Sequence, residues 1–286
     1  MPIWNREIFR PWQLGTFQFV GGSVAGVGTC IVLPELDLVF DVAQGLPPAV
    51  NCSRFFITHG HMDHAAGIPY LISQKAMNNH RAPTFYMPEY MVEPLHYIMK
   101  TWMELENHEY NYRFVAVKPE EKIEINAQYS VVPFPTVHRI HSQGYTLFRE
   151  TKKLKPEFLQ LSPREIVDLK AQGQSIQNHL HEPLVSFTGD TQIEFLDRAD
   201  WVKRSQILFL EVTYIDERKP VEKAREWGHL HLDELLTRLK DLECRHIGIM
   251  HLSRRYTAAQ ARNVIFDRIP KEYHERIFIV PPFGLG

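Results

Sequence analysis

Four side chains that could bind a metal ion lie within six positions of the sequence "ITHGHMDHAAG". They are His59, His61, Asp63 and His64. Neutral imidazoles and carboxylates bind divalent cations at neutral pH, and two neighbouring cations can share a carboxylate and a hydroxide. Because the segment directly follows the apolar run "RFFI", its side chains leave the end of a strand and can converge. This favours a metal site over a solvated, histidine-rich loop.

Three other apolar runs end in residues that could complete such a site. His138 ends "VVPFPTVH", Asp190 follows "LVSFTG", and His251 follows "HIGIM". A single polar residue after a strand is a common turn and indicates little. Four coincident strand ends, whose loops gather at one rim, favour a shared site.

The elements that must position these residues can be read from the hydrophobic pattern. Short apolar runs joined by glycine and proline turns predict strands, and apolar residues at helical spacing predict helices. The strands are expected at 17–20, 29–33, 36–41, 54–59, 84–87, 112–117, 122–125, 129–138, 144–150, 184–190, 206–212, 244–251 and 276–281, and the helices at 65–79, 88–107, 231–241 and 257–268. Two strand-rich halves closed by helices predict an α+β fold, an αββα sandwich of two mostly antiparallel or mixed β-sheets.

We expect a single domain over residues 1–286. Between 150 and 182 the chain becomes polar, and Ser162 and Glu165 form a capping-box start, with Gly173 as a helix stop. This predicts a short polar helical insertion on the β framework.

Composition excludes several other classes of protein. The net charge of -2 gives no overall basic field for nucleic acid or anionic membrane, and no apolar run is long enough for a membrane span. The N-terminus lacks the unbroken apolar core of a signal peptide, and Cys30, Cys52 and Cys244 are too scattered for a disulfide framework. We therefore expect a cytoplasmic protein, with an organelle or the nucleus left open.

Taken together, the motifs resemble those of the metallo-β-lactamase superfamily and, within it, the ribonuclease Z branch of tRNA 3′-processing endonucleases. "HGHMDH" stands at the HxHxDH motif, and "HRIHSQGY" matches the spacing from the third histidine ligand to a Gly-Tyr pair. "FTGDT" matches the bridging aspartate, while "EVTY" and "HLSRRY" resemble two further segments of that branch. The likeness covers nearly the whole chain.

The resemblance implies two divalent metal ions per chain. One would be held by His59, His61 and His138, the other by Asp63, His64 and His251, with Asp190 bridging them. Zinc is the expected ion because the site is rich in imidazole, and manganese or iron is the alternative.

The resemblance also implies the catalytic residues. Asp63 would accept a proton beside a metal-bridged hydroxide that attacks phosphorus. His229, at the position of the family's His-Ser-Thr histidine, would protonate the leaving group or stabilise the pentacoordinate phosphorus, and Glu211 would orient it and keep it charged. The alternative for His229 is that it caps the following helix, and for His231 such a structural role is the main expectation.

Candidate substrate-binding residues lie in two segments. Ser253, Arg254 and Arg255 precede a predicted helix, where its N-terminus and the arginines favour anions. Lys152 and Lys153 belong to the basic run "RETKKLKP", which could contact a nucleic-acid backbone or form a solvated face.

Tyr145 is a further candidate for contact with the substrate, and packing in the core is the alternative for this residue.

The chain departs from the ribonuclease Z pattern in three places. The segment "GGSVAGVGTCIVL" lacks the basic residues of the family's loop after the first strand, and Leu230 and His231 stand where the family has serine and threonine. The segment at 150–182, which corresponds to a long tRNA-binding arm, is expected to be short. These departures weaken the expectation of a tRNA substrate more than that of a phosphodiesterase.

We therefore predict a dinuclear metal-dependent phosphodiesterase, an endoribonuclease acting on precursor tRNA. The alternatives are a small-substrate hydrolase acting on a cyclic phosphodiester, lactone or thioester, and a non-catalytic metal-binding subunit. A homodimer is a further expectation from the resemblance, with apolar helices at 64–80 and 88–107 as candidate interfaces.

Overall fold

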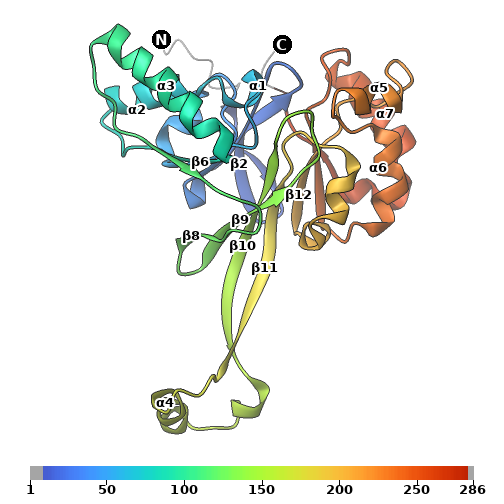
Figure 1. Ribbon diagram of the computed structural model, residues 1–286. Coiled ribbons are helices and arrows are strands. Elements are labelled where there is room, and N and C mark those ends of the chain that lie inside the picture. Colours follow the sequence, from blue (N-terminus) through green and yellow to red (C-terminus); the bar gives the residue numbers. More distant parts are fainter. Residues whose placement is uncertain (1–8, 283–286) are drawn as a thin grey trace.

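The fold is a four-layer sandwich in which two β-sheets pack face to face and helices cover both outer faces (Figure 1). It is seen in a computed structural model that describes residues 9–282. Each sheet has seven strands in the described residues, and each mixes parallel and antiparallel neighbours. The predicted αββα architecture is confirmed.

The first sheet follows the chain order from β1 to β7. Its strands are β1 (Trp12–Leu14), β2 (Phe17–Val24), β3 (Gly28–Leu33), β4 (Leu38–Phe40), β5 (Arg54–Phe56), β6 (Thr84–Met87) and β7 (Arg113–Ala116). The neighbours from β1 to β4 are antiparallel, and those from β4 to β7 are parallel. Its helices are α1 (Met62–Ala65), α2 (Ile68–Met77) and α3 (Glu89–Glu106).

The second sheet repeats this arrangement along the chain, with antiparallel strands first and parallel strands last. Its strands are β8 (Ile123–Asn126), β9 (Tyr129–Pro135), β10 (Gln143–Leu154), β11 (Gln177–Phe187), β12 (Ile207–Glu211), β13 (His246–Met250) and β14 (Ile277–Ile279). The neighbours from β11 to β14 are parallel. Its covering helices are α5 (Val221–Glu226), α6 (Leu232–Arg238) and α7 (Ala258–Arg268).

Short 3₁₀ helices fill several connections. They span Pro34–Leu36, Pro47–Asn51, Pro156–Phe158, Ile193–Asp197, Asp200–Arg204, Leu239–Asp241 and Lys271–Arg276. The first of them shortens the strand expected at 36–41, because Asp37 has a left-handed φ of 59° that ends the turn before β4 begins. Strand β1 and helix α5 were not expected from the sequence.

Aromatic side chains dominate the layer between the sheets. Phe40 of the first sheet stacks on Phe187 of the second, with ring centroids 5.2 Å apart, and Phe56 meets Tyr145 edge to face. Separate apolar clusters join each sheet to its own helices. Burying each such ring contributes about 1.5–3 kcal/mol, so this layer fixes the two sheets relative to each other.

The helix expected at 65–79 begins at Ile68 as α2, and a close approach of two backbones separates it from α1. A Cβ atom on Gly67 would lie 2.0 Å from the amide nitrogen of Gly45, so only glycine fits there. The Gly67 amide donates to the Ala43 carbonyl at 2.8 Å. This contact is not visible in the local pattern, and it sets the direction in which α1 leaves the site.

The segment at 150–182 is a protruding arm rather than a short helical insertion. Strands β10 and β11 continue out of the sandwich as a two-stranded ribbon, and helix α4 (Pro163–Ala171) lies at its tip (Figure 1). The ribbon pairs residue by residue from Arg149–Glu182 out to Leu154–Gln177. The correction has a physical reason: both faces of the ribbon meet water, so it lacks the apolar alternation that marks a strand. The capping box at Ser162 forms as predicted.

Several surface properties bear on partners. No helix in the described part of the chain is long and apolar enough to cross a membrane. The three cysteines are buried and have free thiols. Helices α2 and α3 expose large apolar side chains, namely Met77, Tyr97, Ile98, Trp102 and Leu105. The homodimer stays a prediction.

A substitution at Gly144 tests the packing that holds β10 in place. The ring of Phe134 covers Gly144 on the neighbouring strand, and an added Cβ would lie 2.2 Å from its Cζ atom. We expect Gly144→Ala to lower the free energy of unfolding by about 1–3 kcal/mol, measured by urea denaturation. In a Phe134→Leu background, Gly144→Ala should lower the free energy of unfolding by less. An equal decrease in both backgrounds would exclude the contact with Phe134 as the cause.

Candidate metal centre

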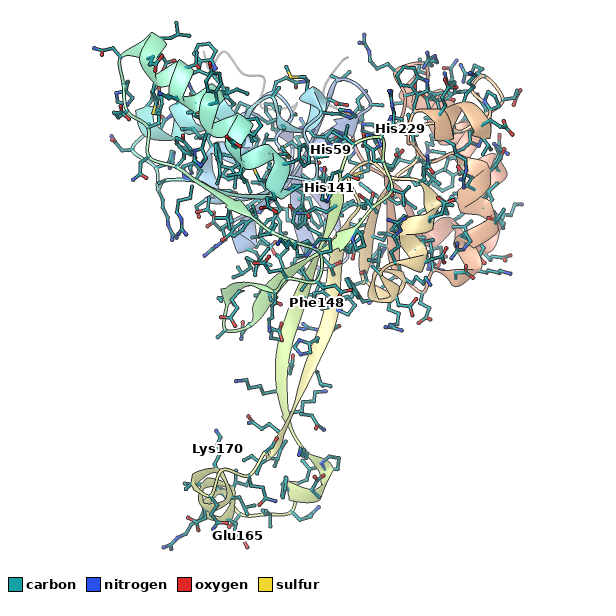
Figure 2. All side chains as sticks on the ribbon, in the orientation of Figure 1. His59, His141, Phe148, Glu165, Lys170 and His229 are labelled. Atoms are coloured by element: carbon teal, nitrogen blue, oxygen red, sulfur yellow. The ribbon has the colours of Figure 1, made fainter. Side chains whose placement is uncertain are left out.

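The predicted ligands meet at the rim where the carboxyl ends of the parallel strands of both sheets come together. Figure 2 places His59 and His229 near one another where the two halves of the sandwich join. His59 follows β5, Asp190 follows β11, and His251 follows β13. The structure brings together all seven residues that the sequence nominated, in overlapping groups whose ligand atoms lie within 4.8 Å of one another.

The first ligand group consists of His59, His61 and His138. The Nδ1 atom of His61 lies 3.1 Å from Nε2 of His59 and 3.2 Å from Nε2 of His138. Three nitrogen atoms thus face a common point, the arrangement expected of imidazoles around one cation.

The second ligand group consists of Asp63, His64 and His251. The Nε2 atoms of His64 and His251 lie 3.4 Å apart, and Oδ2 of Asp63 lies 3.4 Å from Nε2 of His251. Asp63 and His64 come from α1, whereas His251 follows β13 of the other sheet. This group therefore spans the two halves of the sandwich.

Asp190 lies between the two ligand groups and presents one oxygen to each. Its Oδ2 is 3.6 Å from Nε2 of His59, and its Oδ1 is 3.2 Å from Nε2 of His64 and 3.3 Å from Nε2 of His251. Oδ1 is buried and accepts no hydrogen bond of suitable geometry. A buried carboxylate oxygen in this state is costly unless a cation compensates it. The donor set and this oxygen fit a pair of divalent ions.

The far nitrogen of four histidines is held by a hydrogen-bond partner. Asp41 Oδ2 lies 2.7 Å from Nδ1 of His64, and the hydroxyls of Thr58 and Thr213 lie 2.9 Å from Nδ1 of His59 and of His251. The carbonyl of Gly228 accepts from Nδ1 of His138 at 2.8 Å. Such partners fix the ring orientation and leave the other nitrogen, Nε2, to face the site.

Asp41 is the functional residue that sequence reasoning missed. It is fully buried, has a left-handed φ of 51°, and also accepts hydrogen bonds from the amide and hydroxyl of Thr58. Its position directly after the apolar run of β4 is the same signal that identified Asp190. The sequence pattern places Asp41 inside the strand predicted at 36–41, so it does not indicate a residue beyond the strand end.

His251 also has a left-handed backbone, with φ of 57°. Its amide donates to the hydroxyl of Ser23 at 3.0 Å, which holds this strained conformation. Gly26, in the loop after β2, donates its amide to Oδ2 of Asp63 at 2.8 Å. The loop that lacks the family's basic residues therefore supports the ligands through its backbone.

Burial and charge set the protonation of the site. Burial lowers the pKa of all three histidines of the first ligand group, because a charged imidazole would lose its hydration. Burial also opposes charge on His64, but the carboxylates of Asp190 and Asp41 raise its pKa well above the usual value. For Asp190, burial is outweighed by the charges of His251 and His64, which hold its pKa well below its usual range. The carboxylates thus attract positive charge to the place where the ligand groups meet.

His229 and Glu211 form a pair beside the first ligand group. The Nδ1 atom of His229 donates to Oε1 of Glu211 at 2.9 Å, and its ring lies 5.3 Å from that of His138. Glu211 is fully buried and also accepts from the amide of Thr191 and the hydroxyl of Thr213. Burial lowers the pKa of His229, but the carboxylate of Glu211 outweighs it and raises the pKa to about 9. The Glu211 carboxylate therefore favours the protonated form of His229.

His231 has a structural position instead. It is buried and caps α6, where its Nδ1 accepts from the amide of Asp233 and its Nε2 donates to the carbonyl of Asp216. This agrees with the structural role that we expected for it.

Tyr145 does not reach the site. It is fully buried between the sheets, and its hydroxyl donates to the carbonyl of Ile57 at 2.8 Å. Its prediction as a substrate-binding residue is therefore wrong, because alternation along β10 turns this side chain toward the inter-sheet core.

The remaining candidates lie in two places. Ser253 is buried, its amide donating to the carbonyl of Thr213, while Arg254 and Arg255 are exposed just before α7. Lys152 and Lys153 are exposed on the arm, away from the ligands. The structure thus brings the arginines near the rim and keeps the lysines on the ribbon.

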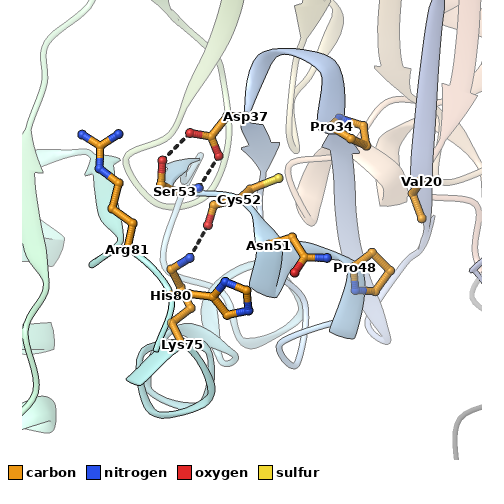
Figure 3. Close-up of a pocket in the computed structure, with 10 residues that line it drawn as sticks. All are labelled: Val20, Pro34, Asp37, Pro48, Asn51, Cys52, Ser53, Lys75, His80 and Arg81. Carbon is orange, nitrogen blue, oxygen red and sulfur yellow. Dashed lines mark hydrogen bonds between the residues drawn. The ribbon is translucent and has the colours of Figure 1, made fainter. Parts of the chain in front are cut away.

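A separate hollow lies at the other ends of β4 and β5 (Figure 3). It has a volume of about 490 Å³, and Lys75 in its floor donates to the carbonyls of Val50 and Cys52. Asp37 accepts from the amide of Ser53 at 2.5 Å. None of the residues predicted for the metal site lines this hollow.

Comparison with known proteins gives consistent results. Residues 39–252 match the family model described as a beta-lactamase superfamily domain. The chain is 31% identical to tRNase Z TRZ1 of Arabidopsis thaliana over 272 residues, which cover 94% of this chain and 96% of that protein. It is 29% identical over 255 residues to the chloroplastic tRNase Z TRZ2 of the same plant, covering 88% and 72% of the two chains.

Solved structures share the fold. The short form of human tRNase Z superposes with a TM-score of 0.58 at 19% identity, covering 92% of this chain and 95% of that one. The metallo-beta-lactamase fold protein YhfI of Bacillus subtilis gives the same TM-score at 14% identity and the same coverage. At these identities the structures speak for the fold alone.

A substitution at Asp41 tests the partner that orients His64. Asparagine tolerates the left-handed backbone but lacks the negative charge. We expect Asp41→Asn to lower metal affinity by about 10- to 100-fold, measured by titration against a competing chelator. The control is Asp37→Asn, at the opposite end of β4, which should keep its metal. Equal loss in both variants would indicate general destabilisation.

Proposed function

This chain belongs to the beta-lactamase superfamily and is related to the tRNase Z enzymes, and we propose that it is a dinuclear metal-dependent phosphodiesterase that cuts precursor tRNA at its 3′ end. One observation carries the proposal: Asp190 presents a separate oxygen to each of two ligand groups, next to the charged pair of His229 and Glu211. A site for two cations with an adjacent proton donor suits hydrolysis of a phosphodiester.

We assign one ion to the first ligand group and the other to the second, with Asp190 shared between them. Bound there, two divalent ions would supply Lewis acidity toward the phosphoryl oxygens and lower the pKa of a water molecule. The preponderance of imidazole favours zinc, with manganese and iron as the alternatives to test.

Asp63 is assigned the role of proton acceptor. Its Oδ2 is held by the amide of Gly26, and its side chain is only 16% exposed at the rim, so it faces the substrate from a fixed position. A carboxylate held beside the attacking water can accept the proton that the water loses.

His229 is assigned the role of proton donor. Its Nδ1–H is committed to Glu211, which leaves the proton on Nε2 for the departing oxygen of the substrate. Thr191 and Thr213 donate hydrogen bonds to Glu211 and hold its carboxylate in place. The carboxylate can therefore fix the orientation of the His229 imidazole. The ribose oxygen that departs from a phosphodiester is a poor leaving group and gains from such a donor, whereas a thiolate leaves without one.

The similarity to tRNase Z enzymes and the presence of the arm together favour tRNA as the substrate. The exposed lysines Lys152 and Lys153 lie on the ribbon, where they can contact a nucleic-acid backbone at a distance from the scissile bond. Arg254 and Arg255 are assigned to phosphates nearer the rim. Each of these contacts would add affinity without specifying sequence.

The assignment of His229 predicts a selective loss of turnover. We expect His229→Ala to lower kcat on a precursor tRNA with a 3′ trailer by about 10²–10⁴-fold while both metal ions stay bound. Glu211→Gln should give a smaller loss in the same direction. The measurement is cleavage of end-labelled RNA, with metal content determined on the same samples, and a chelated wild-type sample should be inactive.

A two-metal protein that cuts no RNA but hydrolyses a lactone or thioester, with His229→Ala retaining activity, would contradict the phosphodiesterase assignment. A chain that fails to bind two ions would favour the non-catalytic alternative.

The assignment of the arm predicts an effect on binding alone. We expect Lys152→Glu with Lys153→Glu to raise KM for precursor tRNA. The slope of the logarithm of the binding constant against the logarithm of the salt concentration should become shallower by about one per lysine. Hydrolysis of bis(p-nitrophenyl) phosphate, which is too small to reach the arm, should not change. Lys240→Glu with Lys271→Glu, an equal charge change on two exposed residues outside the arm, is the control. An equal effect from this control would reduce the role of the arm to overall charge.

A further inference from the structure

The loop between β9 and β10 carries three side chains in three directions. His138 points into the first ligand group, whereas Arg139 and His141 are exposed on either side of it. The hydroxyls of Thr136 and Ser142 lie 2.6 Å apart and close the base of the loop. The loop therefore holds two outward side chains beside the metal site, and His141 and His59 are both labelled in Figure 2.

Arg139 covers an aromatic ring on one side of the site. Its Cζ atom lies 4.8 Å from the ring centroid of Trp227, which is 47% exposed. Trp227 precedes Gly228, whose carbonyl holds His138, and a Cβ on Gly228 would lie 2.7 Å from Nδ1 of that histidine. The Arg139–Trp227 pair is thus fixed directly beside His138 and His229.

His141 meets a second aromatic ring on the other side. Its ring lies nearly parallel to that of Tyr90, at an interplanar angle of 21°, and Tyr90 is 42% exposed. The hydroxyl of Tyr90 accepts from the amide of Gly60, between His59 and His61, at 2.9 Å. Gly60 and Tyr90 also line a largely apolar cavity of about 380 Å³, a volume within the range of ligand sites.

We propose that these two pairs, Arg139 with Trp227 and His141 with Tyr90, are stacking surfaces for the unpaired nucleobases on either side of the scissile phosphate. This rests on the proposed function. Unpaired bases in RNA stack on aromatic rings, including histidine, and on the planar guanidinium of arginine. Trp227 and Tyr90 are 47% and 42% exposed, which leaves part of each ring accessible to a base. The nucleoside whose oxygen is protonated by His229 lies at Trp227, and the nucleoside across the phosphate lies at Tyr90.

The test couples protein variants to abasic substrates. Precursor tRNAs are prepared with an abasic residue immediately 5′ or immediately 3′ of the cut, and kcat/KM is measured for the zinc-loaded wild type, Trp227→Ala and Tyr90→Ala. Stacking of one base is worth about 10- to 100-fold. We expect the kcat/KM of each variant to fall by that factor on the intact substrate. On one of the two abasic substrates, a different one for each variant, the variant and the wild type should have the same kcat/KM.

Conservative variants separate stacking from structure. Trp227→Phe and Tyr90→Phe keep a ring, and the latter removes only the hydroxyl that holds Gly60, so both should keep the coupling to the base. Tyr97→Ala removes an exposed ring on the same helix as Tyr90 and should leave every substrate unaffected. The stacking surfaces are excluded if the decreases in kcat/KM caused by the variant and by the abasic substrate multiply at both positions. They are also excluded if the wild type cuts abasic substrates as fast as intact ones. Neither result contradicts the phosphodiesterase activity. If the two-metal wild type cuts none of the RNAs, the proposed function fails first.

Discussion

The structure depends on keeping one buried carboxylate between two groups of imidazoles. Asp190 is 1% exposed, and its two oxygens face ligands from both sheets. Like-charged or lone-pair-bearing groups packed this closely repel one another unless cations lie between them, so the ligands must be held in place by the rest of the fold. The hydrogen bonds to the far nitrogens and the aromatic layer between the sheets provide that support. Because each sheet contributes ligands, separating the sheets would dismantle both groups.

The same constraint explains why irregular backbone gathers at this rim. Asp41 and His251 both adopt left-handed φ values, and Gly67 approaches another backbone more closely than any side chain would allow. Asp41 and His251 turn the chain at the end of a strand, and Gly67 turns it between α1 and α2. The cost of such turns is of the order of 1–3 kcal/mol each, and the surrounding hydrogen bonds offset it. The strain at Asp41 and His251 thus lies where side chains must converge.

The ligands could be predicted from sequence because each is a metal-binding residue type placed where an apolar run ends. That signal is local, and it located His59, Asp190 and His251 on three separate strands. Thr58 and Thr213 could not be predicted in the same way, because threonines are common in strands and their role depends on which ring lies opposite. Tyr145 was misassigned because proximity in sequence to His138 does not tell which face of β10 a side chain occupies. The arm was missed because a ribbon with both faces in water leaves no hydrophobic period.

The arm's register irregularity has a consequence for how this protein can change. The pairing of β10 with β11 shifts between Leu147 and Phe148, close to where the ribbon leaves the sandwich. Inside that point, the strands lead to Ser142 and Asp190 and must keep their register with the rest of the sheet. From Thr151 outward, the residues of β10 pair only with those of β11, so a pair added or removed there leaves every ligand where it was. The ribbon can therefore be lengthened, shortened or given a new tip as an independent module, while the chemistry at its base stays unaltered.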